Sequence, residues 1–490
     1  MRAATVLLKG RFSSGFIWNL VGVGIPLAFA LYAIPQLLLG YGEVRFGFLT
    51  IVWAVIGYFS VFDLGLGRAL TRLVAARIAQ QGRDIPMLVS TGTLSIAVLG
   101  AVFALPLVFT SSFIVSEILK VDRHFAAEFS AALIVMGVSL PLVTTASAMI
   151  GILEAYGAFA LINRVRLVAG LMNFLAPLLA LHFTSSLILA TTLLAVLRLL
   201  STSIYIFAVK KLVGDLPRFG LWSSSHLNEL WRFGSWITVS NLISPIMSQL
   251  DRLVVGAVLA LAVLPAYSIP GDMVTRLSFI PVAVVGVLFP EFTKAAAQGS
   301  GREEEIYRQS SVLMFFGVLP IAAILYCFAE EALGAWISES FASDSYKLLQ
   351  WLALGFLFNA MARLPHALLQ AAGRPDKTAK IHIAELPIYA AGLWWLLHSF
   401  GVLGAAMAWT LRMALDLLLM SFVLARLKNT VVQTSLATVA VCAIATGLLW
   451  ATSQIEVVWA RALVVMCLTL TCAAVALLSL RKLEHSGERT

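Results

Sequence analysis

The sequence is poor in charged residues and has no long polar segment. Only 12% of its 490 residues are Asp, Glu, Lys or Arg, against roughly 25% in soluble domains. Apolar residues make up 60% of the chain, and the mean hydropathy is +0.93. No segment between the apolar runs is long enough for a soluble domain. These deficits exclude a soluble globular protein.

Motifs for catalysis and cofactor binding are also missing. There is no phosphate-binding loop of the Walker type, no HExxH and no G-x-S-x-G. The four cysteines lack metal-ligand spacing, and all lie in apolar segments, which is typical of inert packing residues: Cys327, Cys442, Cys467 and Cys472. We therefore expect no enzyme activity, no metal and no cofactor. His366, His382 and His398 are interpreted as packing or interfacial residues.

Apolar runs of about eighteen or more residues recur from end to end, and each can cross a bilayer as a helix. They predict an all-α polytopic membrane protein with about fourteen transmembrane helices. The expected spans are 14–39, 45–75, 85–110, 127–152, 158–182, 186–209, 234–260, 264–291, 308–329, 346–371, 378–399, 402–425, 431–453 and 457–480.

The distribution of Lys and Arg predicts the orientation of these helices. With both termini in the cytoplasm, 24 of the 34 basic residues fall on the cytoplasmic side and 5 on the outer side. This asymmetry follows the positive-inside rule and supports an even number of spans. The net charge of +9 therefore belongs to cytoplasmic loops rather than to a nucleic-acid site. Both termini are therefore expected in the cytoplasm.

Three pairs of segments recur at nearly the same offset. Gly15 and Gly234 are 219 residues apart, the segments starting at Leu153 and Leu369 are 216 apart, and Arg198 and Arg412 are 214 apart. Six spans separate the partners, so the pattern predicts two parallel six-helix repeats, with a substrate pathway between them. The expected organisation is an N-terminal lobe at 1–209, a cytoplasmic linker at 210–232, a C-terminal lobe at 233–430, and two further helices with a tail at 431–490.

Several ionisable residues fall inside the predicted spans, where a charge costs ~2.5–3.5 kcal/mol on insertion scales. Arginine suits phosphate because its planar fork donates two parallel hydrogen bonds. Five arginines could line a cationic cavity that binds substrate: Arg198, Arg252, Arg276, Arg363 and Arg412. A second set could bind a coupling ion or form a gate: Asp63, Arg68, Asp251, Asp272, Glu385 and Asp416.

Both sets have a simpler interpretation. Asp272 and Arg276, like Arg412 and Asp416, are four residues apart, so each pair shares a helix face and could neutralise itself. The segment that carries Arg68 could be a basic amphipathic helix at the cytoplasmic interface rather than a gate.

Four segments of the sequence resemble a known family. The resemblance is carried by SGFIWNLVGVGIP, FGFLTIVWAVIGYFSVFDLGLGRALT, SQLDRLVVGAVLA and LLQAAGRPDKTAKIHIAELPIY, and it covers residues 13 to 426. These segments are similar to the Wzx-type polysaccharide and O-antigen flippases of the multidrug/oligosaccharidyl-lipid/polysaccharide exporter superfamily. The last two helices resemble the fourteen-helix members of that superfamily, which include the lipid II flippases.

The resemblance implies two six-helix bundles around a central cationic cavity. It also implies a flippase that carries undecaprenyl-diphosphate-linked oligosaccharide to the outer leaflet by alternating access. The implied partners are this substrate, membrane lipids, a polysaccharide polymerase and a chain-length regulator, and no nucleic acid. Only some of the candidate residues lie in the matching segments: Asp63, Arg68, Asp251, Arg252, Asp272 and Arg276.

Two alternatives remain. A drug or cation antiporter of the same superfamily should favour buried acids over arginines. A membrane glycan polymerase or ligase should carry a large outer loop with clustered Arg and His, which this sequence lacks.

Overall fold

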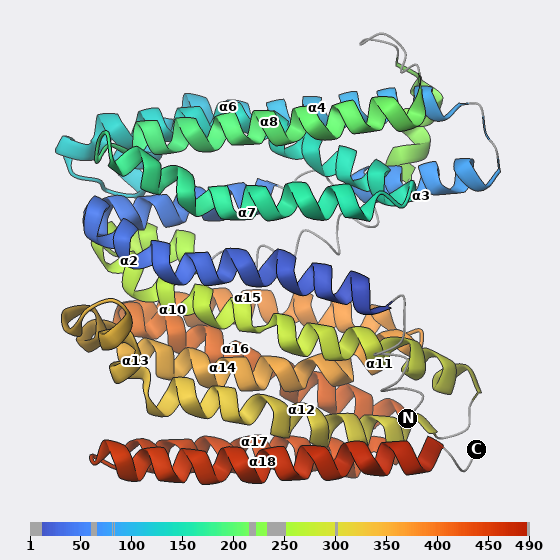
Figure 1. Cartoon of the computed structure of the whole chain (residues 1–490), viewed down its shortest axis with the longest axis vertical. Coiled ribbons are helices and arrows are strands. Elements are labelled where there is room, and N and C mark those ends of the chain that lie inside the picture. The colour runs from blue at the N-terminus through green and yellow to red at the C-terminus, as the bar shows by residue number, and fades with distance from the viewer. Residues whose placement is uncertain are drawn as a thin grey trace. The chain divides into compact units, whose positions relative to one another are not determined.

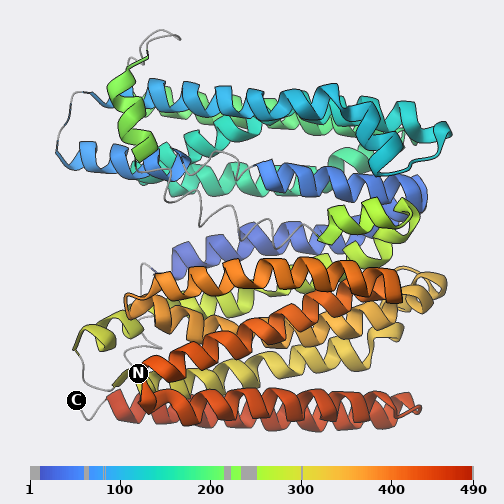
Figure 2. The same cartoon turned by 180° about the vertical axis from the view of Figure 1, so that it is seen from behind.

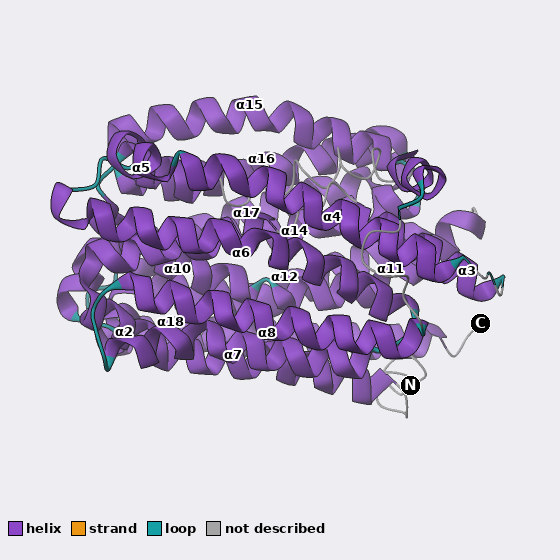
Figure 3. Ribbon diagram, turned by 90° about the horizontal axis from the view of Figure 1, so that it is seen from above, coloured by secondary structure: helices purple, strands orange, loops and turns teal. Residues whose placement is uncertain are grey.

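The computed structural model describes residues 12–59, 66–80, 82, 84–214, 222–232, 251–298 and 302–487. Throughout these ranges every regular element is a helix, and short loops join the helices (Figure 3). The chain divides into two compact units, one formed by Ser13–Pro265 and the other by Ala266–Thr490 together with the first residues. Each unit is described by itself below.

The first unit contains one kinked helix at its start and a bundle that follows. Its helix α2 spans Phe12–Phe59 and changes direction at Gly42, whose φ is 74°. Residues 224–232 and 251–258 are also helical. The remaining elements are α3 (Leu66–Ala79), α4 (Ile85–Phe109), α5 (Ser111–Phe113), η1 (Ile114–Ile118), α6 (Arg123–Ala155), α7 (Phe159–Leu181), α8 (Leu187–Val213) and η2 (Leu261–Val263).

The second unit is built almost entirely from long helices (Figure 1). In it α14 packs most closely against α16, and α18 lies along α12 (Figures 1 and 2). The elements are α10 (Leu264–Leu277), α11 (Phe279–Gln298), α12 (Arg302–Cys327), α13 (Ala329–Trp336), α14 (Glu339–Ala371), α15 (Pro375–Phe400), α16 (Val402–Leu427), η3 (Asn429–Val431), α17 (Val432–Ser453) and α18 (Val458–Gly487).

Eleven helices of the described part of the chain are long and apolar enough to cross a membrane. This confirms an all-α polytopic membrane protein, while the count of fourteen spans stays a prediction. Some predicted bounds follow the observed ones closely: 85–110 corresponds to α4, and 402–425 corresponds to α16. Others do not, because the predicted span 264–291 is divided at Ser278 into α10 and α11, and the predicted span 45–75 falls partly in α2 and partly in α3. The short helix α13 lies in a segment that the sequence pattern treated as a loop.

The two units repeat the same helix order. The 33-residue helix α6 and the 33-residue helix α14 begin and end 216 residues apart, and α7 and α15 begin at the same offset. Asp122 and Ser338, again 216 residues apart, cap the first pair through their side chains. The offset inferred from sequence is therefore present in the helix bounds themselves.

The turn after each of these long helices is closed in the same way. Gly157 has φ 73° and Gly373 has φ 74°, a backbone conformation that costs other residues about 1–2 kcal/mol. In the first turn Ala158 N donates to Leu153 O, and in the second Arg374 N donates to Leu369 O. These bonds close a Schellman-type end and satisfy carbonyls that a helix end leaves open.

We predict that Gly157→Ala and Gly373→Ala each lower the free energy of unfolding by about 1–2 kcal/mol. A methyl group would meet nothing within 4 Å at either position, so the cost is backbone strain alone. Thermal unfolding in lipid nanodiscs measures it, and Gly286→Ala is the matched control, because Gly286 is equally uncrowded without a positive φ. Equal stability of all three variants would contradict this account of the turns.

Close helix contacts depend on small and hydroxylated residues, as is usual where lipid surrounds a bundle. Gly355 of α14 lies against the ring of Trp409 and the hydroxyl of Thr410 on α16. The Thr410 hydroxyl donates to the Trp351 carbonyl at 2.7 Å, so it brings no unsatisfied donor into the contact. In the first unit, the Thr202 hydroxyl donates to the Leu142 carbonyl at 3.1 Å and joins α8 to α6 in the same manner.

A polar network fastens residues 222–232 to the ends of α3 and α4. Arg77 donates to Asp84 at 3.0 Å and to Glu229 at 2.8 Å, and His226 contacts Asp84 at 3.1 Å. Burial alone would raise the pKa of Asp84, but the hydrogen bonds from Arg77 and His226 outweigh it and hold that pKa below its ordinary value. The ionised carboxylate is therefore the form that the folded chain stabilises.

We expect Asp84→Asn to lower the melting temperature by roughly 1–3 °C at pH 7, because the Arg77 ion pair is partly exposed. The lowered pKa means that this stabilisation is complete above the unfolded-state pKa of about 4 and disappears as the pH falls through the folded-state value. Melting curves from pH 3 to pH 7 test the sign. The difference from wild type should vanish at the acid end, and a constant difference would contradict the assignment; Asp344→Asn, at an exposed acid, is the control.

Candidate functional site

Side chains from α14, α15 and α16 converge on a charged cluster inside the second unit. On each helix the contributing residues are three or four positions apart, which places them on one face. They are Asn359, Arg363 and His366 of α14, His382, Glu385 and Tyr389 of α15, and Arg412 and Asp416 of α16. Because these three helices pack against one another, the three polar faces meet.

Two carboxylates and an imidazole form the centre of this cluster. His382 Nδ1 is 3.4 Å from Glu385 Oε2 and 3.8 Å from Asp416 Oδ1. One ligand atom from each of the three residues lies within 4.8 Å of the other two. Glu385 has no exposed surface, and the Asp416 side chain is 13% exposed. Two acids this close in a buried site repel each other when both are ionised.

Each carboxylate has one oxygen that the described residues leave without a hydrogen bond. Glu385 Oε1 and Asp416 Oδ1 are buried and accept no hydrogen bond from any described residue. A buried carboxylate oxygen without a donor costs free energy, which binding of a proton or a cation would recover. The arrangement can therefore take up and release one positive charge.

Two arginines, Arg363 of α14 and Arg412 of α16, balance the charge of the acids. Arg363 donates to Asn359 Oδ1 at 3.2 Å and is close enough to attract Asp416. The Arg412 guanidinium lies 5.2 Å from the centre of the Tyr389 ring and also attracts Asp416. With His382 neutral, these two arginines and two acids leave the cluster without net charge.

The structure thus brings together four of the residues selected from sequence: Arg363, Glu385, Arg412 and Asp416. It adds His382, which the sequence analysis had interpreted as a packing or interfacial residue. Its position three residues before Glu385, on the same helix face, is the signal that could have identified it. His366, the other histidine of the cluster, has its ring 5.8 Å from that of His382.

The other selected residues lie elsewhere. Asp251 and Arg252 are buried, with 4% and 9% exposure, and the Arg252 backbone N–H donates to Asp251 Oδ1 at 2.9 Å. Asp272 and Arg276 are half-buried on α10, Arg68 is exposed on α3, and Asp63 is outside the described residues. Arg198 and Arg252 belong to one unit and Arg276, Arg363 and Arg412 to the other, so a cavity shared by the five arginines stays a prediction.

Arg198 differs from the arginines of the cluster. It is half-buried in the middle of α8, a helix that is apolar enough to cross the membrane. Among the described residues its guanidinium has no hydrogen-bond or ion-pair partner, and only its backbone carbonyl is engaged, by the Ser201 hydroxyl. An arginine in this position has its donors available for an anionic ligand.

Comparison with known proteins places the chain in one family. A family model described as polysaccharide biosynthesis protein matches residues 43–344. The chain belongs to this family. It is also 29% identical over 412 residues to a "Putative O-antigen transporter" of Shigella flexneri, a match that covers 84% of this chain and 97% of that protein. The resemblance to the polysaccharide and O-antigen flippases is therefore confirmed.

Solved structures show the same fold. The lipid II flippase MurJ superposes with a TM-score of 0.73 at 12% identity, over 94% of this chain and 98% of MurJ. A multidrug-resistance MATE transporter of the MOP superfamily gives 0.64 at 15% identity, over 89% of this chain and 99% of that structure. The relatives of this polysaccharide biosynthesis protein are named as transporters and flippases, not as enzymes. It is a multi-pass membrane transporter.

Proposed function

We propose that the protein is a flippase that carries undecaprenyl-diphosphate-linked oligosaccharide from the inner to the outer leaflet of the bacterial cytoplasmic membrane. Its termini lie in the cytoplasm, as the excess of basic residues on one side predicts. The glycan and diphosphate follow the pathway that the sequence predicts between its two six-helix repeats, while the lipid tail stays in the bilayer. Access to this pathway alternates between the inner and the outer side.

The single observation that carries this proposal is Arg198. No described residue pairs with the Arg198 guanidinium, and a charge in the middle of an apolar helix is costly, so we infer that the substrate supplies the counter-charge. A diphosphate fits because it accepts two parallel hydrogen bonds from the guanidinium fork. We extend the role to Arg252 and Arg276, while Arg363 and Arg412 mainly balance the carboxylates of the cluster.

The carboxylate cluster supplies the coupling step in this proposal. Glu385 and Asp416, with His382 between them, bind a proton or a cation in one state and release it in another. The three residues come from α15 and α16. A change of one charge among them changes the electrostatic attraction to Arg363 and Arg412, and this in turn changes how these helices pack. Asp63, Arg68, Asp251 and Asp272 are assigned to gating rather than to this step.

Membrane lipids and the lipid-linked glycan are the direct partners that we propose. A polysaccharide polymerase and a chain-length regulator would act on the same glycan after it reaches the outer leaflet.

A deletion strain tests the function. Lipid-linked oligosaccharides are extracted and identified by mass spectrometry, and surface polysaccharide is examined on a gel. Accumulated undecaprenyl-diphosphate glycan together with loss of surface polymer is the expected result, and restoration by the intact gene is the control. Unchanged lipid intermediates with normal polymer, in a strain without a second flippase, would refute the proposal.

A cation-coupled antiporter for small molecules is the second candidate. The specific observation in its favour is the carboxylate pair in the second unit, because buried acids can exchange a cation for a cationic drug. Increased drug sensitivity of the deletion strain with normal surface polysaccharide would favour it.

A further inference from the structure

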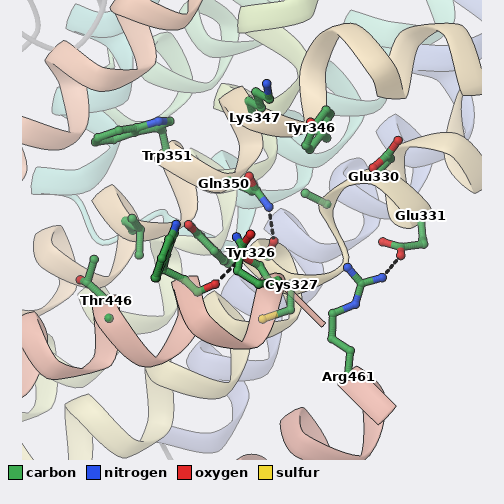
Figure 4. Close-up of a pocket in the computed structure, with 16 residues that line it drawn as sticks. Tyr326, Cys327, Glu330, Glu331, Tyr346, Lys347, Gln350, Trp351, Thr446 and Arg461 are labelled. Atoms are coloured by element: carbon green, nitrogen blue, oxygen red, sulfur yellow. Dashed lines mark hydrogen bonds and ion pairs between the residues drawn. The ribbon is translucent and has the colours of Figure 1, made fainter. Parts of the chain in front are cut away.

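The second unit contains a large hollow that the transport proposal does not use. It lies at the end of the unit where α12 leads into α13 and α17 leads into α18, and its volume is about 750 Å³. Small-molecule pockets typically range from about 300 to 1,000 Å³. Side chains from five helices line the hollow: α12, α13, α14, α17 and α18 (Figure 4).

The walls of this hollow are held by contacts of their own. Gln350 Nε2 donates to the Tyr326 carbonyl at 3.2 Å, which joins α14 to α12. Arg461 of α18 forms an ion pair with Glu331 of α13, and its guanidinium lies 5.2 Å from the centre of the Phe328 ring. The contacts of Arg461 join α18 to residues that are more than a hundred positions earlier in the sequence. A site built in this way is largely formed before a ligand arrives, which reduces the entropy lost on binding.

Aromatic rings and planar polar groups are combined around the hollow. Figure 4 shows Trp351 and Thr446 on one side and Glu330, Glu331 and Arg461 on the other, with Gln350 between them. Trp450 and Tyr346 contribute two further rings. The face of an aromatic ring is electron-rich and attracts the slightly positive C–H face of a sugar ring. Amides and carboxylates around it match the rim of sugar hydroxyls, which both donate and accept hydrogen bonds.

The charges around the hollow favour an uncharged ligand. Glu330 and Glu331 are matched by Lys347 and Arg461, so the lining has no formal net charge. An isolated phosphate would have to approach two carboxylates, and a simple cation would meet two basic groups. The hollow also differs from the Arg198 position, where no acid of the described residues lies beside the guanidinium.

We propose that this hollow binds a neutral saccharide, with a sugar ring stacked on Trp351 and its hydroxyls hydrogen-bonded to the side chain of Gln350. Under the proposed function, on which the choice of sugar and the side of the membrane rest, the hollow faces the outer surface. There it holds the glycan of the translocated lipid next to the place where the lipid leaves the protein.

Saturation-transfer NMR on the full-length protein in phosphatidylcholine nanodiscs tests this site. Nanodiscs replace maltoside detergents because those detergents carry sugars. The probe is the water-soluble repeat unit released from the host surface polysaccharide, and glycerophosphoethanolamine serves as a head-group probe. The variants are Trp351→Leu and Gln350→Ala. Trp394→Leu is the matched control, since Trp394 is an exposed tryptophan of the same unit outside the hollow.

We expect saturation transfer to the C–H protons of the sugar with the wild type and with Trp394→Leu. Binding should be about tenfold weaker with Trp351→Leu, as loss of one stacked ring predicts. Gln350→Ala keeps every aromatic side chain of the hollow and should also weaken binding of the sugar. If Trp351→Leu does not fold, this variant tests the site on its own.

Three results would overturn the site: no transfer with the wild type, equal binding by all the variants, or transfer to glycerophosphoethanolamine in place of the sugar. If any of these occurs while the deletion strain still accumulates the lipid-linked glycan, the site fails and the flippase function stands. If the deletion strain accumulates none, the function fails whatever the hollow binds.

Discussion

Replacing Arg198 by alanine is expected to lower export of surface polysaccharide by about tenfold to a hundredfold, since a hydrogen bond to a charged group contributes roughly 1.5–3 kcal/mol. The protein itself should be at least as stable as the wild type, because the substitution removes from α8 a costly charge that no described residue neutralises. Loss of activity without loss of stability is the signature of a substrate-binding residue. If Arg198 were a structural residue, its replacement would lower the stability of the protein, and export per folded molecule would stay normal.

Two matched variants sharpen this test. Arg198→Lys keeps the charge but loses the planar fork, so we expect export between those of the wild type and Arg198→Ala. Arg164→Ala removes an exposed arginine near the start of α7 and should leave export unchanged. Surface polysaccharide gels and membrane protein levels are measured for all strains. Normal export by Arg198→Ala would remove this residue from the substrate path.

Replacing Glu385 by glutamine is expected to lower export about tenfold or more while raising the melting temperature. Glu385 has no exposed surface, and one of its oxygens accepts no hydrogen bond from the described residues. The amide removes both the buried charge and its repulsion of Asp416. Asp416→Asn should have the same effect, and the double variant should lose little more than either single one, because the two acids act as one site.

The melting temperature also reports the bound charge. A cation or proton that binds only the folded protein stabilises it, so the melting temperature of the wild type should rise relative to that of Glu385→Gln as the sodium concentration or the acidity increases. If sodium binds at the pair, the melting temperature of Glu385→Gln should not change with sodium concentration, and if a proton binds there, this variant should lack the stabilisation by acid. Glu339→Gln, at an exposed acid, should behave as the wild type does. A normal response by Glu385→Gln would remove the coupling role from the cluster.

Much of the fold could be predicted because membrane helices follow local rules. Length and hydropathy predict the ends of α4 and α16 to within two residues of the observed ends. The 216-residue offset between Leu153 and Leu369 is also the offset between α6 and α14. The glycines at 157 and 373 show why the offset is so regular, since each closes the same turn.

The site was predicted only in part, because it depends on which helix faces meet. Sequence spacing placed Arg412 and Asp416 on one face but gave no sign that Glu385 of another helix lies within 4.8 Å of Asp416. The same limit applies to His382, whose role follows from two contacts with residues of different helices. The hollow beside α13 combines residues from Tyr326 to Arg461, and a single helix pattern does not reveal such a combination.

The most direct test of the central claim is translocation by the purified protein. The protein is reconstituted into liposomes that contain an undecaprenyl-diphosphate oligosaccharide with a fluorescent label on its glycan, and a membrane-impermeant reductant is added outside. With the wild type the protected inner-leaflet fraction should become accessible and lose its fluorescence. Liposomes with Arg198→Ala should retain that fraction, as protein-free liposomes do. Equal protection in wild-type and protein-free liposomes, with cation gradients of either direction imposed, would contradict the flippase account.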